Sequence, residues 1–185
     1  EQTQSGFQIL FLINDILDMS KIEAGNMELF VSEFHISDLV EQVKNISQSL
    51  ADKNNNKIIY EVEDGLTSMK GDETRLRQCV VNLISNAVKF TENGTITVRV
   101  ESDRQIDDGL NISVSATGIG MTDTQLPKIF EDFTQADDET TPKFGGTGRG
   151  LALTSTLVTR MHALRAVDRN MALGSTFTLR IPRFL

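Results

Sequence analysis

The sequence contains a single cysteine among its 185 residues, so no disulfide bond can form within one chain. It also lacks any apolar stretch long enough to cross a membrane, and its first residues do not resemble a signal peptide. Basic residues are few, with 18 Lys and Arg against 26 Asp and Glu. The resulting formal charge of −8 argues against a nucleic-acid backbone as the main partner. A nucleotide is still compatible with this charge, because a few local basic groups can reverse the field around a site.

The chain length suits one domain, or one domain with an appendage, and it is sufficient to bury a hydrophobic core. Periodicity and turn residues predict helices at 6–24, 37–50, 71–91 and 151–161, and strands at 27–36, 57–63, 95–101, 110–115, 164–167 and 175–181. Ser37 and Asp38 are suited to cap the second helix, and three asparagines at 54–56 indicate a turn. The strands at 95–101 and 110–115 should form an antiparallel hairpin, and the strands at 164–167 and 175–181 should form a closing hairpin. In this order the elements predict an α+β fold, a two-layer sandwich in which helices pack on one face of a mixed sheet.

The helix at 71–91 carries two different faces. Apolar residues recur at three- and four-residue spacing and form a buried stripe: Leu76, Val80, Leu83, Ile84 and Val88. Cys79 lies on the flank of this stripe, where packing in the core is its expected role. Asn82, Asn86 and Lys89 follow one another at i, i+4 and i+7, so they stack on another face. Two carboxamides and an ammonium group can hold a divalent ion and the oxygens of a phosphate chain, although a solvated polar face would produce the same pattern.

Two glycine-rich segments follow this helix. The first, Ala116 to Met121, comes directly after a strand, where Gly118 and Gly120 allow the backbone to turn and to approach a flat ligand closely. The second, Gly145 to Leu151, follows a polar stretch at 135–148 with the length of a lid or binding loop, and it opens a helix. Glycine-rich backbone that enters a helix N-terminus binds phosphate through its N–H groups and the helix dipole. An ordinary turn and a flexible hinge are the alternatives for the two segments taken singly, and the second segment is neither a Walker motif nor a dinucleotide fingerprint.

Together these segments resemble the catalytic, ATP-binding domain of sensor histidine kinases, which shares the Bergerat (GHKL) fold with DNA gyrase, a heat-shock chaperone and a mismatch-repair ATPase. The four boxes of this family are matched in order: the asparagine box by Asn82 to Thr91, the first glycine box by Ala116 to Met121, the phenylalanine box by Lys128 to Asp137, and the second glycine box by Gly145 to Leu151. Upstream, Leu12 to Gly25 resembles the last helix of a dimerisation and phosphotransfer domain. The resemblance runs from about residue 7 to residue 182 and is closest to hybrid kinases of bacterial two-component signalling and phosphorelay. It implies that residues 1–25 are the C-terminal part of the phosphotransfer hairpin and that residues 26–185 are the ATP-binding catalytic domain.

The resemblance also implies a role for individual residues. Asn86 would ligate the Mg²⁺ ion that bridges the phosphates of ATP, with Asn82 beside it, and Lys89 would contact phosphate. Gly118 and Gly120 would flank the adenine. The remaining positions belong to the lid, in which Phe130 and Phe133 would pack the base and the second glycine box would fold over the phosphates: Gly146, Thr147, Gly148, Arg149, Gly150 and Leu151.

Three departures from the family pattern bear on activity. Ala116 stands where the family has an aspartate whose carboxylate accepts a hydrogen bond from the adenine amine. Alanine cannot accept it, and the loss is worth roughly 1.5–3 kcal/mol, or about ten- to a hundredfold in affinity. Arg149 replaces an apolar residue, and because a buried guanidinium is costly, it should point toward phosphate or solvent. Met161, His162 and Ala163 stand where a Gly-Gly pair is usual, and the stretch at 164–173 matches the family poorly.

The family's phosphoacceptor histidine lies on the first helix of the phosphotransfer domain, ahead of the residues present here. Neither His35 nor His162 has its sequence context, so we expect no autophosphorylation of this chain at the usual site. One hypothesis is that the chain is the ATP-binding part of a hybrid sensor kinase and transfers the γ-phosphoryl group of Mg-ATP to a histidine supplied elsewhere. The other is a pseudokinase or docking module with impaired nucleotide binding, which Ala116 and Arg149 favour and the retained asparagine box opposes.

An ATPase of the gyrase or chaperone branch is a third alternative. Those enzymes carry a glutamate as general base where this chain has Asn82, and a carboxamide cannot take a proton from water, so we expect ATP hydrolysis to be slow or absent. The partners implied are ATP, a dimerisation and phosphotransfer domain, and a receiver domain or another histidine kinase. The first helix has more apolar surface than one stripe needs, so we expect a weak homodimer through it or a monomer. The expected location is the cytoplasm, with an inner-membrane anchor elsewhere in the parent protein left open.

Overall fold

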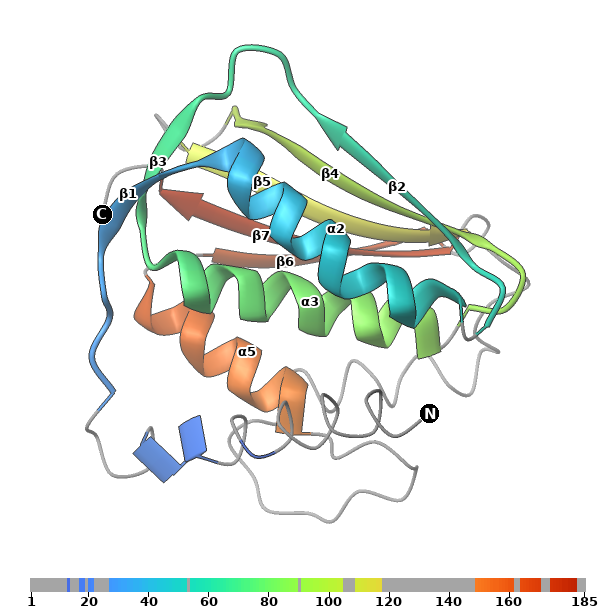
Figure 1. Ribbon diagram of the computed structural model, residues 1–185, viewed down its shortest axis with the longest axis horizontal. Coiled ribbons are helices and arrows are strands. Elements are labelled where there is room, and N and C mark those ends of the chain that lie inside the picture. Colours follow the sequence, from blue (N-terminus) through green and yellow to red (C-terminus); the bar gives the residue numbers. More distant parts are fainter. Residues whose placement is uncertain are drawn as a thin grey trace.

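The computed structural model describes residues 13, 17–18, 20–21, 27–52, 54–89, 91–104, 109–117, 149–161, 164–170 and 174–182. A five-stranded sheet forms one layer of the fold (Figure 1). Its strands follow the order β2 (Lys57–Val62), β4 (Thr95–Asp103), β5 (Gly109–Thr117), β7 (Gly174–Pro182) and β6 (Leu164–Asn170). β2 runs parallel to β4, and the other neighbouring strands are antiparallel, so the prediction of a mixed sheet is confirmed. The two predicted hairpins, β4 with β5 and β6 with β7, are also confirmed.

Three helices cover one face of this sheet and form the second layer: α2 (Ile36–Asp52), α3 (Glu73–Lys89) and α5 (Arg149–Arg160) (Figure 1). Along the strands, side chains that face the helices are buried and alternate with side chains that face the other way. In β5 the side chains of Leu110, Ile112, Val114 and Ala116 are buried, whereas the residues between them are partly exposed. α3 lies between α2 and α5 and packs over β5, which explains why it is buried on several sides. The predicted two-layer α+β sandwich is therefore the observed fold.

A second, two-stranded sheet joins the start of α2 to the start of α3. It pairs β1 (Ser32–His35) with β3 (Ser68–Gly71) in antiparallel register. The sequence does not predict β3, because its four residues are too few to show a period-two pattern. The strand predicted at 27–36 is shorter than expected, since Ile36 already begins α2 and donates its N–H to the carbonyl of Thr67 at 3.1 Å. The residues predicted to cap this helix, at 37 and 38, consequently lie inside its first turn.

Asp72 fixes the N-terminal end of α3. Its Oδ1 accepts a hydrogen bond from the backbone N–H of Arg75 at 3.1 Å, as an N-cap residue does for the unpaired donors of a first turn. Its Oδ2 accepts from the backbone N–H of Phe30 at 2.9 Å. One carboxylate therefore begins the helix and also holds the chain segment that precedes β1.

Two asparagines, Asn54 and Asn56, bond to backbone carbonyls at the C-terminal end of α3 and just after it. Asn56 is buried, and its Nδ2 donates to the carbonyl of Thr91 at 2.6 Å while its Oδ1 accepts from the N–H of Gly94 at 2.9 Å. The Nδ2 of Asn54 donates to the carbonyl of Val88 at 2.9 Å. These bonds satisfy carbonyls that the end of a helix leaves without partners, and they confirm the turn predicted at 54–56.

Several predictions fall wholly or partly outside the described residues. Within the helix predicted at 6–24, the described positions 13, 17–18 and 20–21 are helical. The lid predicted at 135–148 and the phenylalanine box at 128–137 lie outside the described ranges. α5 begins at Arg149, so the prediction that the second glycine segment opens a helix is confirmed. None of the helices in the described part is long and apolar enough to span a membrane.

Burial makes Cys79 chemically inert. The side chain has no exposed surface, and desolvation raises the pKa of its thiol to about 12. Since only the thiolate attacks disulfide reagents, and at pH 8 such a group is ionised to about one part in ten thousand, we expect no labelling of the folded protein and complete labelling in urea. Mass spectrometry of the labelled protein measures both.

The same burial predicts a loss of stability at alkaline pH. A thiol with a raised pKa in the folded state stabilises the fold fully below its unfolded pKa of about 8.5, and this contribution is lost as pH rises toward the folded value. The free energy of unfolding should therefore fall between pH 8 and pH 10, and a Cys79→Ala variant should show a smaller fall. In the labelling experiment described above, modification of Cys79 in the folded protein at pH 8 would contradict the burial on which both predictions rest.

Candidate functional site

Asn82 is buried where α3 contacts α5. Its exposed fraction is 7%, and its Nδ2 donates a hydrogen bond to Oγ1 of Thr154 at 3.3 Å. Thr154 is itself fully buried. Buried polar side chains are nearly always hydrogen-bonded, because an unpaired one loses its bonds to water without replacement. The pair therefore links the two helices on which most of the predicted ligand-binding residues within the described ranges lie.

Asn86 follows Asn82 by one helical turn and is partly exposed. Its Nδ2 donates to the backbone carbonyl of Asn82 at 2.9 Å. Because the nitrogen is used in this way, the amide oxygen Oδ1 is the atom with which Asn86 can bind a cation. Lys89 is exposed in the last turn of α3, where the helix dipole favours a positive charge. The structure thus brings the two asparagines into contact and places Lys89 at the end of the same helix.

Ala116 is buried near the end of β5, in register with Ile96 of β4 and Ser175 of β7. It lies on the face of the strand over which α3 packs, so the position belongs to the interior, and its methyl group offers no hydrogen-bond acceptor. The strand predicted at 110–115 is longer than expected. The ladder with β4 continues through Thr117, so the start of the first glycine box is part of the strand.

Only the last three residues of the second glycine box lie within the described ranges. Arg149, Gly150 and Leu151 are the first three residues of α5. The first N–H groups of a helix have no partner within the helix and point toward a potential anion. The other predicted ligand-binding residues lie outside the described ranges: Gly118, Gly120, Phe130, Phe133, Gly146, Thr147 and Gly148. Among the residues that are described, no three His, Cys, Asp or Glu side chains gather into a metal site.

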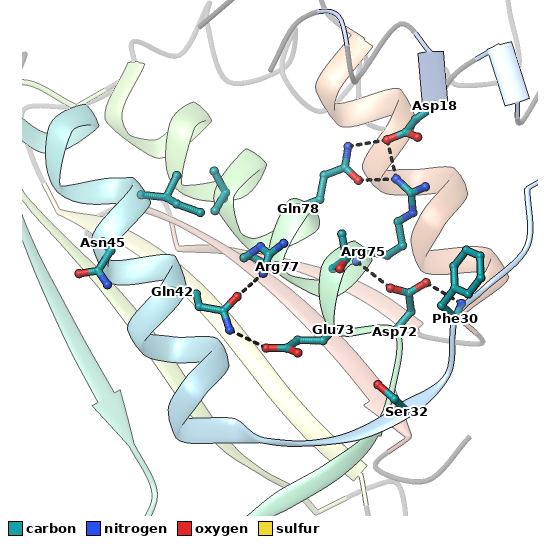
Figure 2. A pocket seen from close by; sticks show the side chains of 13 residues that line it. Asp18, Phe30, Ser32, Gln42, Asn45, Asp72, Glu73, Arg75, Arg77 and Gln78 are labelled. Atoms are coloured by element: carbon teal, nitrogen blue, oxygen red, sulfur yellow. Dashed lines mark hydrogen bonds and ion pairs between the residues drawn. The ribbon is translucent and has the colours of Figure 1, made fainter. Parts of the chain in front are cut away.

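A cavity of about 850 Å³ lies at the N-terminal half of α3 (Figure 2), and neither Asn86 nor Lys89 is among the residues that line it. Gln42 of α2 lines this cavity and bonds to two residues of α3. Its Nε2 donates to Oε1 of Glu73 at 2.7 Å, and its Oε1 accepts from Arg77. Each charged side chain that lines the cavity is hydrogen-bonded to another residue of the lining. This arrangement does not favour a ligand of either charge, and we do not assign the cavity to the nucleotide.

Sequence reasoning missed Thr154. It lies at helical spacing within the buried stripe of α5, between Leu153 and Leu157. A polar residue inside an apolar stripe is a signal for a buried hydrogen bond, but its partner on α3 is 72 positions away in the sequence. Only the packing of the two helices identifies that partner.

The sequence profile of the family described as "Histidine kinase-, DNA gyrase B-, and HSP90-like ATPase" matches residues 71–184, which is more than half of the chain. The chain belongs to this family. The matched part begins just before α3 and runs through α5 to β7, so it contains the asparagine pair, Ala116 and the described end of the second glycine box.

Relatives of this ATPase-family domain are sensor kinases. The chain is 41% identical over 183 residues to the circadian input-output histidine kinase CikA of Synechococcus elongatus, and 37% identical over 184 residues to the autoinducer 2 sensor kinase/phosphatase LuxQ of Vibrio vulnificus. Each match covers 96% of this chain, and the chain spans only 24% and 21% of those proteins. The solved structure of full-length ShkA in complex with AMPPNP is similar, with a TM-score of 0.75 and 31% identity over 97% of this chain and 36% of that one. These likenesses confirm the histidine kinase resemblance and the fold that it implies.

The contact between Asn82 and Thr154 predicts a difference between two substitutions at position 154. Thr154→Val keeps the shape but leaves the buried amide without this acceptor, which should lower the free energy of unfolding by about 1–3 kcal/mol. Thr154→Ser keeps the hydroxyl and should cost less, about 1 kcal/mol for the lost methyl group. Urea unfolding followed by circular dichroism measures both, and equal losses in the two variants would contradict the assigned bond.

Proposed function

We propose that this chain is the nucleotide-binding catalytic domain of a two-component sensor histidine kinase and that it transfers the γ-phosphoryl group of Mg-ATP to a histidine outside the sequence given. The observation that carries the proposal is the Asn82–Asn86 pair, held at the contact of α3 and α5 within a chain of the histidine kinase family. A buried amide, bonded through its backbone to a partly exposed amide one turn later, needs a reason beyond stability. Binding of a cation and phosphates supplies that reason.

The residues of α3 would act on the phosphate chain. Asn86 would offer Oδ1 to Mg²⁺, because its Nδ2 is held by the carbonyl of Asn82. The ion neutralises phosphate charge when it is bound. Lys89, exposed at the end of the helix, would contact a phosphate oxygen as a point charge. Asn82, tied to Thr154, would support Asn86 from the turn before it.

The glycine boxes and the phenylalanine box would complete the site. Gly118 and Gly120 would lie beside the adenine, and Phe130 and Phe133 would pack under the lid. The second glycine box would bring backbone N–H groups to the phosphates: Gly146, Thr147, Gly148, Arg149, Gly150 and Leu151. Arg149 stands at the first position of α5, where the helix dipole already favours an anion.

The domain division follows from the same proposal. Residues 1–25 would belong to the dimerisation and phosphotransfer hairpin, and residues 26–185 would form the catalytic domain. A phosphotransfer domain would then be the direct partner, with a receiver domain or another kinase following in the relay. ATP as phosphoryl donor would place the domain in the cytoplasm.

Ala116 supports a second candidate function, that of a docking module with impaired nucleotide use. The position is buried and beside α3, and no side-chain acceptor exists there for the adenine amine. Such a module would keep the fold and act by binding another kinase. Nucleotide affinity decides between the two functions.

A calorimetric titration with a non-hydrolysable ATP analogue tests both candidates. We expect binding by the unaltered protein that strengthens with Mg²⁺, and binding by an Ala116→Asp variant that is tighter by about ten- to a hundredfold, because a charged acceptor is restored. The gain should be absent for a guanine nucleotide, which lacks the exocyclic amine at that position.

Two further variants control this titration. Asn86→Ala should abolish the effect of Mg²⁺, whereas Ser85→Ala, at an exposed neighbouring position on α3, should leave it unchanged. Binding by the Ala116→Asp variant alone would locate the defect in the adenine contact. Absence of binding in every variant would overturn the kinase proposal and favour the docking module.

Asn82 also predicts that the domain transfers phosphate without hydrolysing ATP. The carboxamide is buried and bonded to Thr154, and it cannot accept a proton from water. Phosphate release from Mg-ATP should therefore not exceed the background measured with heat-unfolded protein. Steady release above that background would favour an ATPase of the gyrase or chaperone branch.

A further inference from the structure

The N-terminal helix meets α3 through one acidic side chain. Asp18 is only 8% exposed, and its Oδ2 accepts hydrogen bonds from Nη1 of Arg75 at 2.5 Å and from Nε2 of Gln78 at 3.2 Å (Figure 2). Nη1 of Arg75 also lies 3.1 Å from Oε1 of Gln78, so the three side chains bond to one another. The partners are 57 and 60 positions apart in the sequence, and the ion pair is largely withdrawn from water, with side-chain exposures of 16% for Arg75 and 12% for Asp18.

The two described apolar residues of the same helix, Ile13 and Leu17, do not take part in this contact. Ile13, five residues before Asp18, is 47% exposed, and Leu17, one residue before it, is 52% exposed. A helix ordinarily docks through its apolar stripe. Among the described residues of this helix, the acid is buried and the apolar side chains face outward. The part of the contact with α3 that the structure describes is therefore made by an ion pair and hydrogen bonds, and removing one partner of a buried ion pair leaves the other charge uncompensated.

The chain that follows is held by different bonds. The carbonyl of Met27 accepts from Nη1 of Arg160, in the last turn of α5, at 2.6 Å, and the Met27 side chain is buried. The N–H of Phe30 donates to Asp72. These contacts do not involve Asp18, so the chain from Met27 onward can stay in place when the ion pair opens. The cavity beside the pair, which Asp18 and Arg75 both line, leaves room for such a movement (Figure 2).

We propose that Asp18, Arg75 and Gln78 form an electrostatic latch that holds the N-terminal helix on the nucleotide-binding domain, and that the latch opens without disturbing the domain itself. The inference rests on the proposed function in one respect, namely that the N-terminal helix belongs to the phosphotransfer domain. The latch then sets the position of that helix relative to α3, which carries Asn82 and Asn86. Arg75 and Gln78 are positioning residues in this arrangement, since they touch neither substrate nor cation.

A distance measurement between two spin labels tests the latch in the whole chain. Ile13→Cys and Lys44→Cys introduce labels at exposed positions on the N-terminal helix and on α2, and the native Cys79 is buried and stays unlabelled. Without nucleotide we expect a single narrow distance distribution. Asp18→Ala and Arg75→Ala should each broaden it, and the reversed pair Asp18→Arg with Arg75→Asp should restore a narrow one.

Glu61→Gln is the matched control. It breaks the ion pair of Glu61 with Arg99 on β2 and β4, whose side chains are 47% and 53% exposed, and it should leave the distance distribution unchanged. A distribution that stays narrow in both alanine variants would overturn the latch. Failure of the reversed pair to restore a narrow distribution would overturn it as well, because the helix would then not be held by the attraction of opposite charges at these two positions.

The latch and the proposed function can fail separately. The labels report the position of the helix in the absence of nucleotide, and calorimetry with the ATP analogue reports binding. Asp18→Ala should bind the analogue as the unaltered protein does, because the latch is built from side chains outside the predicted nucleotide site. Loss of binding in this variant with a narrow distance distribution would contradict the proposal.

Discussion

Burial of α3 between the sheet, α2 and α5 is the constraint on which the other parts of the structure depend. Leu76, Leu83 and Ile84 are almost fully buried, and each such side chain contributes roughly 1.5–3 kcal/mol relative to exposure. A helix packed on three sides cannot rotate about its axis without exposing these groups. The direction of every polar side chain on α3 follows from this packing.

Both ends of α3 are fixed by side chains from distant segments, and this matters for a site built on its surface. Asp72 begins the helix and holds the segment before β1, whereas Asn54 and Asn56 close the C-terminal end and the turn into β4. Between these ends, the bonds from Asn86 to the Asn82 backbone and from Asn82 to Thr154 hold the amides in one orientation. Binding groups that are fixed before the ligand arrives lose little conformational entropy on binding.

The same helix carries two groups of polar side chains at different positions along its length. Its C-terminal half bears the asparagine pair and Lys89, and its first two turns bear Arg75 and Gln78, which contact the N-terminal helix. Ala116 lies on the strand beneath α3 and takes part in none of these side-chain hydrogen bonds.

The sequence alone determined the periodic elements, the mixed sheet with its two hairpins and the polar face of α3, because each depends on local spacing or on the alternation of burial along one strand. The four boxes in their order also indicated the family from the sequence. Other features were decided by tertiary structure. The strand β3 forms only because β1 lies beside it. Thr154 is the partner of Asn82, and Asp18 is the partner of Arg75, at separations of 72 and 57 residues. No local pattern encodes such pairs. They result from how helices and chain segments pack against one another, and the spacing of residues along one sequence does not reveal that packing.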